Sequence, residues 1–213
     1  MATTEQRAKD DRFFEALFQV CKAVTSSLDV AKVLQVTCES TAKALNAKAC
    51  SIRLLTPRGD ELVLGAAYGL SEDYLRKGPV AVSRSLVDQR ALAGEIVEIK
   101  DASKDPGFQY PEAAAREGIR SVIVVPLPGR NRAIGVMRVY MAEPHEFTEE
   151  ERRFLMAAAD IAALCIENAR LYQELQAENE RLRADLRDWH SAWGLETLPE
   201  PEELSRQTRP GRE

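Results

Sequence analysis

The sequence contains few of the residues from which metal and redox sites are built. Among its 213 residues there are two histidines and four cysteines, and no two cysteines stand at a CxxC-like spacing. Zinc and iron–sulfur centres need such clustered ligands, so we expect no metal and no cofactor. The thiols lie in apolar or amphipathic segments, which predicts buried and reduced side chains. They belong to Cys21, Cys38, Cys50 and Cys165.

Basic charge and long apolar runs are also lacking. The net charge of −5 disfavours a nucleic-acid-binding surface. No run approaches the roughly 18 apolar residues that cross a bilayer, and the N-terminus, MATTEQRAKDD, lacks the apolar core of a signal peptide. We therefore predict a protein of a bacterial-type cytoplasm. Its 213 residues suffice for one domain with an extension, and its hydrophobic content of 45% is that of an ordinary soluble protein.

The patterns that are present begin with two amphipathic helices. Apolar side chains recur at three- and four-residue spacing from about Gln6 to Ser27 and again over residues 30–45. Asp29 is a suitable N-cap for the second helix, and Asn46 suits the left-handed residue that ends it.

The middle of the chain has the pattern of strands. Residues 47–70 predict two strands joined by a turn at residues 57–60, and residues 95–100 alternate like an edge strand. Residues 121–127 and 133–141 predict a hairpin. Because nearly every residue of this hairpin is apolar, its part of the sheet should be covered on both faces. Short helices are expected after Ser71, before Gly94 and from Glu112.

A long helix is expected near the C-terminus. Thr148 and Glu151 form a capping box, and no helix breaker follows until Gly194. A helix of about 45 residues would be about 65 Å long at 1.5 Å per residue. This is longer than a domain of this size can cover, so we predict that the helix leaves the domain.

Taken together, the segments from about Arg12 to Leu175 resemble a GAF domain. The resemblance implies an α+β fold, with an antiparallel sheet of five to six strands. A bundle of N- and C-terminal helices would cover one face, and loops would cover a ligand pocket on the other. The family serves bacterial signalling as sensors and dimerisation units. The segments are SLDVAKVLQVTCESTAKALNAKACSIRLL, AAYGLSEDYLRKGPV, DASKDPGFQYPEAAAREGIRSVIVVPL and AIGVMRVYMAEPHEFTEEERRFLMAAADIAALCIENARLYQEL.

This organisation divides the chain into four parts. Residues 1–10 are a polar segment, residues 11–170 the GAF-like domain, residues 171–193 a coiled-coil extension of the last helix, and residues 194–213 a tail of disordered composition. We expect no output domain after the helix, and we therefore expect any signal to pass to a separate partner protein.

The sequence lacks the residues on which the better-known chemistries of GAF domains depend. The region from Ala66 to Gly118, which would hold the pocket loops, has no cysteine to attach a bilin or to reduce a sulfoxide. Cys50 would be an isolated thiol, and only His145 and His190 are available as haem ligands. The Asn-Lys-Phe-Asp-Glu signature of cyclic-nucleotide GAF domains is absent. We therefore expect no catalytic residues and no enzymatic activity.

Several residues are candidates for reading a ligand. Arg53 and Arg138 stand in otherwise apolar strands that would lie side by side, and two guanidinium forks suit a carboxylate or phosphate. Alternatively, each pairs with an acid on a neighbouring helix. Arg84 and Ser85 precede a helix and could hold an anion, or the serine simply caps that helix. The remaining candidates could line a pocket or pack its loops: Tyr68, Asp101, Phe108, Tyr110 and Ser121.

The last helix also carries a heptad pattern. Apolar residues and two asparagines recur seven apart, and Asn179 at an a position favours a parallel two-stranded coil. The alternative is a helix that folds back on its own domain. The predicted dimer residues, with two from the first helix, are Phe14, Leu17, Ile161, Cys165, Asn168, Tyr172, Leu175, Asn179, Leu182, Leu186 and Trp189.

These observations predict a dimeric sensor without enzymatic activity, which binds a small molecule and signals to another protein. Two alternatives remain open. The first is a pure interaction module with a filled pocket. The second is a redox enzyme of the free methionine sulfoxide reductase type, which would depend on Cys50.

Overall fold

The computed structural model describes residues 4–27, 29–76, 78–102 and 110–192, and the chain divides into two units, Met1–Ala169 and Arg170–Glu213. The first unit is built on an antiparallel sheet with the strand order β3-β2-β1-β6-β5-β4, as the α+β expectation requires. In chain order the elements are α1 Thr4–Ser26, α2 Val30–Ala44, β1 Ala49–Leu55, β2 Glu61–Tyr68, α3 Glu72–Leu75, β3 Val80–Ala81, η1 Val82–Arg84, α4 Leu86–Leu92, β4 Val97–Ile99, α5 Pro111–Glu117, β5 Ser121–Leu127, β6 Gly135–Met141 and α6 Glu149–Ala192.

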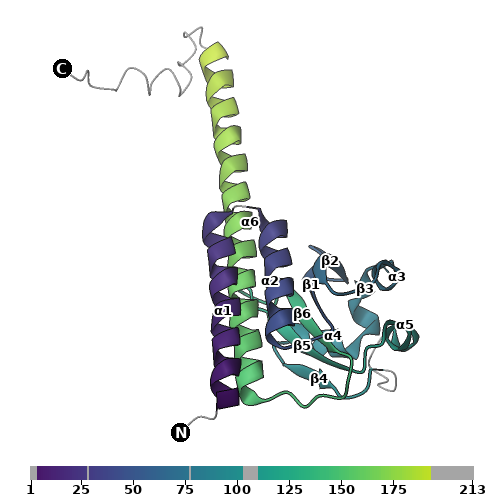
Figure 1. The fold of residues 1–213 in the computed structure, drawn as a ribbon. Helices are drawn as coiled ribbons and strands as arrows, with labels where there is room; N and C mark the ends of the chain where they lie inside the picture. The colour runs from purple at the N-terminus through teal and green to yellow at the C-terminus, as the bar shows by residue number, and fades with distance from the viewer. Residues whose placement is uncertain (1–3, 28, 77, 103–109, 193–213) are drawn as a thin grey trace, which may run out of the picture. The chain divides into compact units, whose positions relative to one another are not determined.

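Three helices form a layer on one face of the sheet: α1, α2 and the first part of α6 (Figure 1). The ring of Phe13 stacks on that of Phe154, with 4.5 Å between the centroids. One turn earlier in each helix, Lys9 Nζ lies 3.0 Å from Glu151 Oε1. These two contacts show that α1 and the start of α6 run in the same direction. They also show that α1 extends into the polar segment predicted for residues 1–10.

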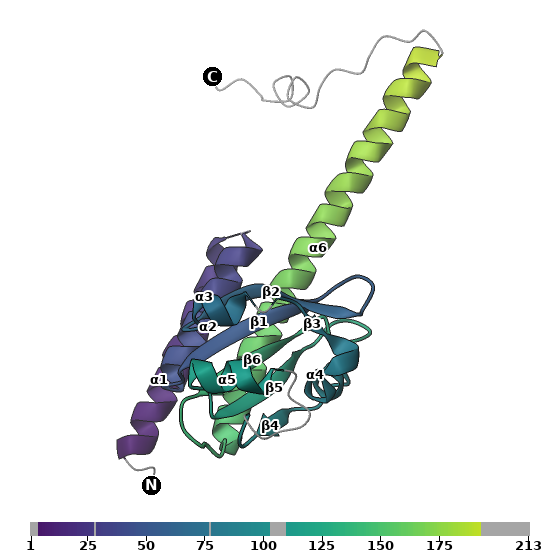
Figure 2. The same cartoon turned by 90° about the vertical axis from the view of Figure 1, so that its right-hand side faces the viewer.

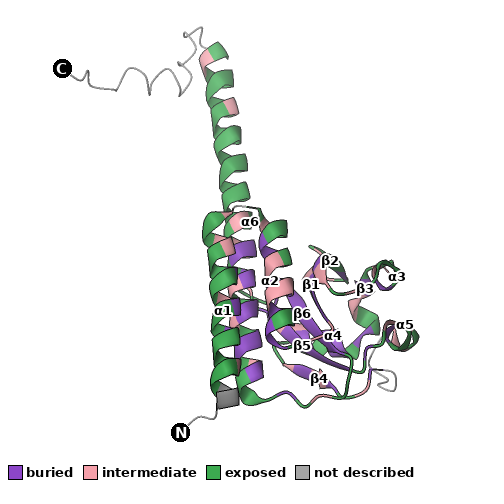
Figure 3. Cartoon of the chain, viewed as in Figure 1, coloured by how far each residue is buried: buried purple, intermediate pink, exposed green. Residues whose placement is uncertain are grey.

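Side chains alternate between the two faces of the sheet. Ile52 and Met137 point into the core beneath the helix layer, whereas Val136 and Tyr140 belong to a second core on the other side. That second face is covered by α3, α4 and α5 (Figure 2). The hairpin is therefore buried on both faces, as its continuous apolar runs predict; Figure 3 shows its strands in the colour of buried residues.

Helix ends lie where the capping residues predict them. The Asp29 carboxylate accepts from the backbone N–H of Ala31 at 3.0 Å, and Asn46 has the expected positive φ of 50°. At the start of α6, Glu151 accepts from the Thr148 N–H at 2.9 Å, and Thr148 Oγ1 accepts from the Glu151 N–H at 3.3 Å. This is the reciprocal capping box that the sequence predicts.

Two backbone features shape the centre of the sheet beside Arg53. The register between β1 and β2 shifts between Ile52 and Arg53, where Gly65 of β2 is left without an opposite residue. Such bulges bend a strand and re-aim its side chains. On the other side, a Cβ at Gly135 would lie 2.2 Å from the Arg53 carbonyl oxygen. Strands β1 and β6 can approach this closely only because position 135 is glycine.

Helix α6 is continuous over its 44 residues. Its first turns are buried in the domain, but from Arg170 onward nearly all of its side chains are exposed. The predicted end of the helix near Gly194 and the tail that follows lie outside the described residues. Of the helices in the described ranges, none is both long and apolar enough to cross a membrane.

Candidate functional site

A buried polar cluster lies on the sheet face that α3, α4 and α5 cover. It consists of Ser51 and Arg53 from β1, Arg138 and Tyr140 from β6, and Asp88 from α4; we call these five residues the arginine cluster. The strand register explains its position. Ser51 pairs with Arg138 across β1 and β6, and alternation brings Arg53 and Tyr140 to the same face. The sequence prediction that the two arginines share one side of the sheet is consistent with this register.

Arg138 is neutralised by an acid on a neighbouring helix. Its Nη2 donates to both carboxylate oxygens of Asp88, a residue that is fully buried. Burial lowers the pKa of Arg138, but the Asp88 carboxylate outweighs this effect and raises the pKa above its ordinary value. Ser85 is the N-cap of α4 and accepts from the Asp88 N–H at 3.3 Å, so the cap fixes the turn that carries the carboxylate.

Arg53 has a weaker set of partners. Its Nη1 donates to the carbonyl oxygens of Leu62 and Gly78, both at 3.3 Å. Burial, with a contribution from the charge of Arg138, lowers the pKa of Arg53. Within the part of the chain that the structure describes, Nε of Arg53 and Nε of Arg138 have no hydrogen-bond partner. Two donors of the arginine cluster thus remain unused.

Aromatic side chains complete the surroundings of the cluster. The hydroxyl groups of Tyr140 and Ser51 form a hydrogen bond of 3.0 Å, and the ring of Tyr74 from α3 meets Tyr140 edge-on, with 6.1 Å between the centroids. Burial raises the pKa of Tyr74, and its neighbour Tyr140 adds to the effect. Tyr110 donates from its hydroxyl to the Pro79 carbonyl at 3.3 Å, which ties the start of α5 to the chain before β3.

The other predicted ligand residues have surroundings of their own, and Ser85 is tied to the arginine cluster through the Asp88 N–H. Tyr68 packs against the helix-side core, with Lys43 Nζ 5.8 Å from its ring centroid. Ser121 Oγ donates to the Glu143 carbonyl at 2.9 Å. Asp101 Oδ2 lies 3.8 Å from Arg120 Nη2, Arg84 is exposed, and Ser85 acts as the cap described above. Phe108 lies outside the described residues.

Four residues of this site were not predicted as ligand residues: Asp88, Ser51, Tyr140 and Tyr74. Asp88 follows Ser85 by three positions, which is the spacing of a capping pair, and this gave a signal for its helix position only. The partners of Ser51 and Tyr140 depend on which strands are neighbours. Periodicity alone does not specify that order.

Cys50 was expected to be an isolated thiol, but a second thiol, that of Cys38, lies in the same core. Cys38 of α2 and Cys50 of β1 lie near enough for Cys38 to influence the pKa of Cys50. Both are buried in the helix-side core, on the opposite face from Arg53 and Arg138. Burial raises the pKa of Cys50, and Cys38 adds to the effect. Since the thiolate is the reactive form, this environment makes Cys50 a poor nucleophile.

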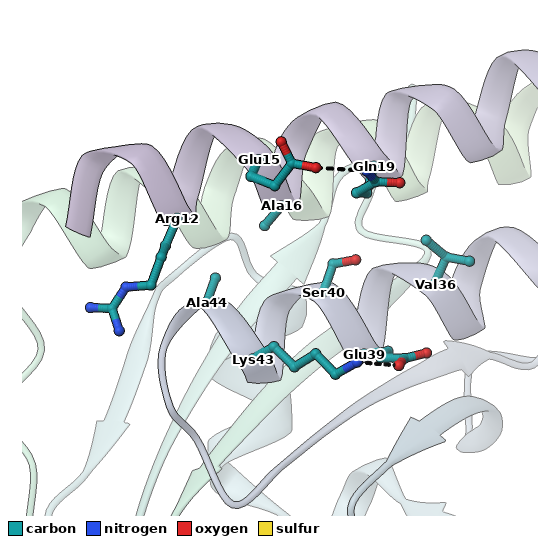
Figure 4. A pocket seen from close by; sticks show the side chains of 9 residues that line it. All are labelled: Arg12, Glu15, Ala16, Gln19, Val36, Glu39, Ser40, Lys43 and Ala44. Carbon is teal, nitrogen blue, oxygen red and sulfur yellow. Dashed lines mark hydrogen bonds and ion pairs between the residues drawn. The ribbon is translucent and has the colours of Figure 1, made fainter. Parts of the chain in front are cut away.

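An open groove of about 500 Å³ lies between α1 and α2 (Figure 4). Two pairs of its polar side chains are joined within a helix. Lys43 Nζ lies 2.6 Å from Glu39 Oε1, and Gln19 Nε2 donates to Glu15 Oε1 at 2.7 Å. Arg12 also lines this groove. The groove belongs to the helix layer and is separated by the sheet from the arginine cluster.

Comparison with known proteins agrees with this architecture. Residues 29–168 match the GAF domain family. The chain is 24% identical over 176 residues to the Nif-specific regulatory protein of Herbaspirillum seropedicae, which covers 80% of this chain and 32% of that protein. It is also 24% identical over 174 residues to the formate hydrogenlyase transcriptional activator of Salmonella typhimurium, covering 79% of this chain and 25% of that protein. The chain thus spans about a quarter to a third of these relatives.

Solved structures show the same fold. The GAF domain from the Acinetobacter phosphoenolpyruvate-protein phosphotransferase has a TM-score of 0.63 at 25% identity, with 76% of this chain and 97% of that chain covered. The free methionine-R-sulfoxide reductase from Neisseria meningitidis has a TM-score of 0.63 at 26% identity, with coverage of 75% and 91%.

The chain therefore belongs to the GAF domain family. Its curated relatives include regulators of transcription.

Proposed function

We propose that this protein is a regulatory GAF module of the cytoplasm that forms a homodimer, binds a small molecule and passes the signal to a partner protein. Its relatives among transcriptional regulators support the signalling role. The buried arginine cluster supports the proposal that the protein binds a small molecule, because polar groups that converge on one sheet face are typical of a binding site.

The row of exposed apolar side chains on α6 carries the proposal of a dimer. Tyr172, Leu175, Leu182, Leu186 and Trp189 are each about half or more exposed, and they follow the a and d positions of the predicted heptads. Such side chains lose contact with water only against another surface.

Within the domain, before Arg170, fewer of the predicted dimer residues are exposed than the heptad pattern predicts. Cys165 is buried in the chain's own core, and Leu17 packs against that core, while Phe14 is 72% exposed. Ile161 is half-buried and Asn168 is exposed. We therefore place the start of the coil near Asn168.

Sedimentation equilibrium of the full chain tests the dimer. The double variant Leu175→Glu with Leu182→Glu should be monomeric at micromolar concentration, because two charges at each d layer would be buried against their copies. Ala177→Glu with Ala184→Glu is the matched control. It adds the same charge at f positions, which point away from the seam, and should remain dimeric. A double leucine variant that stays dimeric would remove the coil from the proposal.

The proposal includes no enzymatic activity. A fold neighbour is a free methionine-R-sulfoxide reductase, but here the thiols of Cys38 and Cys50 are buried on the side of the sheet opposite the arginine cluster. A coupled assay with free methionine sulfoxide and a thiol reductant should therefore show no turnover. Turnover that disappears in Cys50→Ser would make the protein an enzyme.

A further inference from the structure

We infer that Arg53 and Arg138 together bind the carboxylate group of a small, singly charged molecule. The inference rests on the proposed small-molecule sensing and adds the chemical class of the ligand. It is carried by three observations on the arginine cluster: its charge, its unused donors and the segment that covers it.

The charge of the cluster is not balanced. Among the residues that the structure describes, two guanidinium groups and the single carboxylate of Asp88 leave one positive charge, and Asp88 acts electrostatically on both arginines. Arg53 is 2% exposed, Arg138 3% and Asp88 0%. A buried charge without a counter-charge is costly. An anion with one negative charge would make the site neutral.

The donors of the cluster fit a planar anion. Nε of each arginine is buried without a hydrogen-bond partner among the described residues, and an unused buried donor costs free energy. A carboxylate has two oxygens that each accept a guanidinium N–H, which is the geometry that arginine forks recognise. Phosphate and sulfate dianions would instead leave one buried negative charge.

The segment over Arg53 is lightly attached. β3 pairs with β2 through two residues only, and the chain before it is held by the bond from Tyr110 to the Pro79 carbonyl. The bonds of Arg53 to the carbonyls of Leu62 and Gly78 are long, at 3.3 Å. A Cβ on Gly78 would meet no atom within 4 Å, so this stretch is not packed against a neighbour on the Cβ side of Gly78. A carboxylate would replace these two carbonyls as the partner of Arg53.

The first test uses the full chain and three monocarboxylates of increasing size: acetate, butyrate and benzoate. Thermal unfolding is followed at constant ionic strength, with the matching amides and with phosphate as comparisons. At tens of millimolar, at least one carboxylate should raise the unfolding midpoint by several degrees, and its amide and phosphate should not. Equal shifts from amide and carboxylate, a larger shift from phosphate, or no shift from any of the three would overturn the inference.

The second test needs no ligand. Arg53→Met removes the unbalanced charge and leaves the pair of Arg138 and Asp88 intact. The free variant should unfold at a higher temperature than the parent, while its affinity for the carboxylate that shifted the parent should fall about 10- to 100-fold, the loss of one charged hydrogen-bonding partner. Arg130→Met, which changes an arginine that is 70% exposed, is the control and should alter neither property.

A structural role for Arg53 would give the opposite pattern. The Arg53→Met chain would then unfold at a lower temperature than the parent, and the inference would be wrong. Arg53→Lys keeps the charge but loses the fork, and it should bind the carboxylate more weakly while remaining folded. The dimer test uses residues beyond Arg170, so a chain that is dimeric but indifferent to carboxylates would refute the anion site alone.

Discussion

The carboxylate of Asp88 allows Arg138 of strand β6 to be buried in the core, because it neutralises the guanidinium charge. Arg138 donates to both of its oxygens, and neither residue reaches solvent. A buried ion pair adds little stability over an apolar pair, but removing one partner leaves an uncompensated charge. The stability lost when one partner is substituted is therefore much larger than the net contribution of the ion pair to the stability of the fold.

We predict that Asp88→Asn destabilises the protein by about 3–5 kcal/mol, because it breaks a buried ion pair on one side only. Urea unfolding followed by circular dichroism measures the change. Asp73→Asn alters a carboxylate that is 89% exposed and paired with Arg76 on the surface, and it should cost less than about 1 kcal/mol. Equal losses in the two variants would show that the Asp88 pair is not buried in solution.

In the pair of Arg138 and Asp88, the sequence indicates the arginine but not the acid. Arg138 stands out as a charge within an apolar strand, and an acid on a neighbouring helix is one of the two partners expected for it. Asp88 itself lies 50 positions earlier, in a short helix whose placement on the sheet depends on the tertiary fold. The local sequence pattern indicates that the buried arginine needs an acidic partner. Which acid this is depends on the topology of the fold.

Among the helices, the first turn of α6 joins several elements through Glu151. This carboxylate accepts from the Thr148 N–H, lies 2.9 Å from His145 Nε2 and pairs with Lys9 of α1. Burial alone would raise its pKa, but His145, the Thr148 N–H and Lys9 together lower the pKa below its ordinary value of 4.5. The charged form is therefore favoured in the folded protein.

The sign of the resulting pH dependence follows directly. Because the folded pKa is depressed, the contribution of Glu151 is complete above about pH 4.5 and is lost as the pH falls through the lower folded value. Glu151→Gln should destabilise the protein near neutral pH and flatten the loss of stability in acid. Unfolding free energies from pH 6 down to about pH 3 measure both effects. Glu146→Gln, at a carboxylate that is 86% exposed, should keep the parent's slope.

Most element boundaries followed from local signals. The helix before Asn46, the cap at Thr148 and the hairpin of β5 and β6 lie within a few residues of their predicted limits. In each case the deciding residue acts within one turn of its own position. Local signals do not indicate that Cys38 and Cys50 share one core or that Tyr68 lies on the helix side of the sheet. They depend on which face of the sheet α2 covers, and this is a long-range property.

For the whole molecule, Asn179 is the residue that would set the oligomeric state. An asparagine at an a position favours two parallel strands at a cost in stability. Asn179→Ile should therefore raise the thermal stability of the assembly and broaden its mass distribution beyond the dimer. Native mass spectrometry measures the distribution. Ala177→Ile adds apolar volume at an f position and should leave it unchanged. A purely dimeric Asn179→Ile chain would argue against the assigned heptad register.

The only exposed thiol among the four cysteines belongs to Cys21, on the same side of α1 as the exposed rings of Phe14 and Phe18. Any association of two chains through this face would bring two accessible sulfurs near one another. Oxidation in air could then join two chains by a disulfide between their Cys21 residues, and this covalent dimer would have the same mass as the reversible one. Mass measurements made with and without a reductant would distinguish the covalent dimer from the reversible one. A nitroxide attached at the native Cys21 would report the distance between the chains without an introduced cysteine.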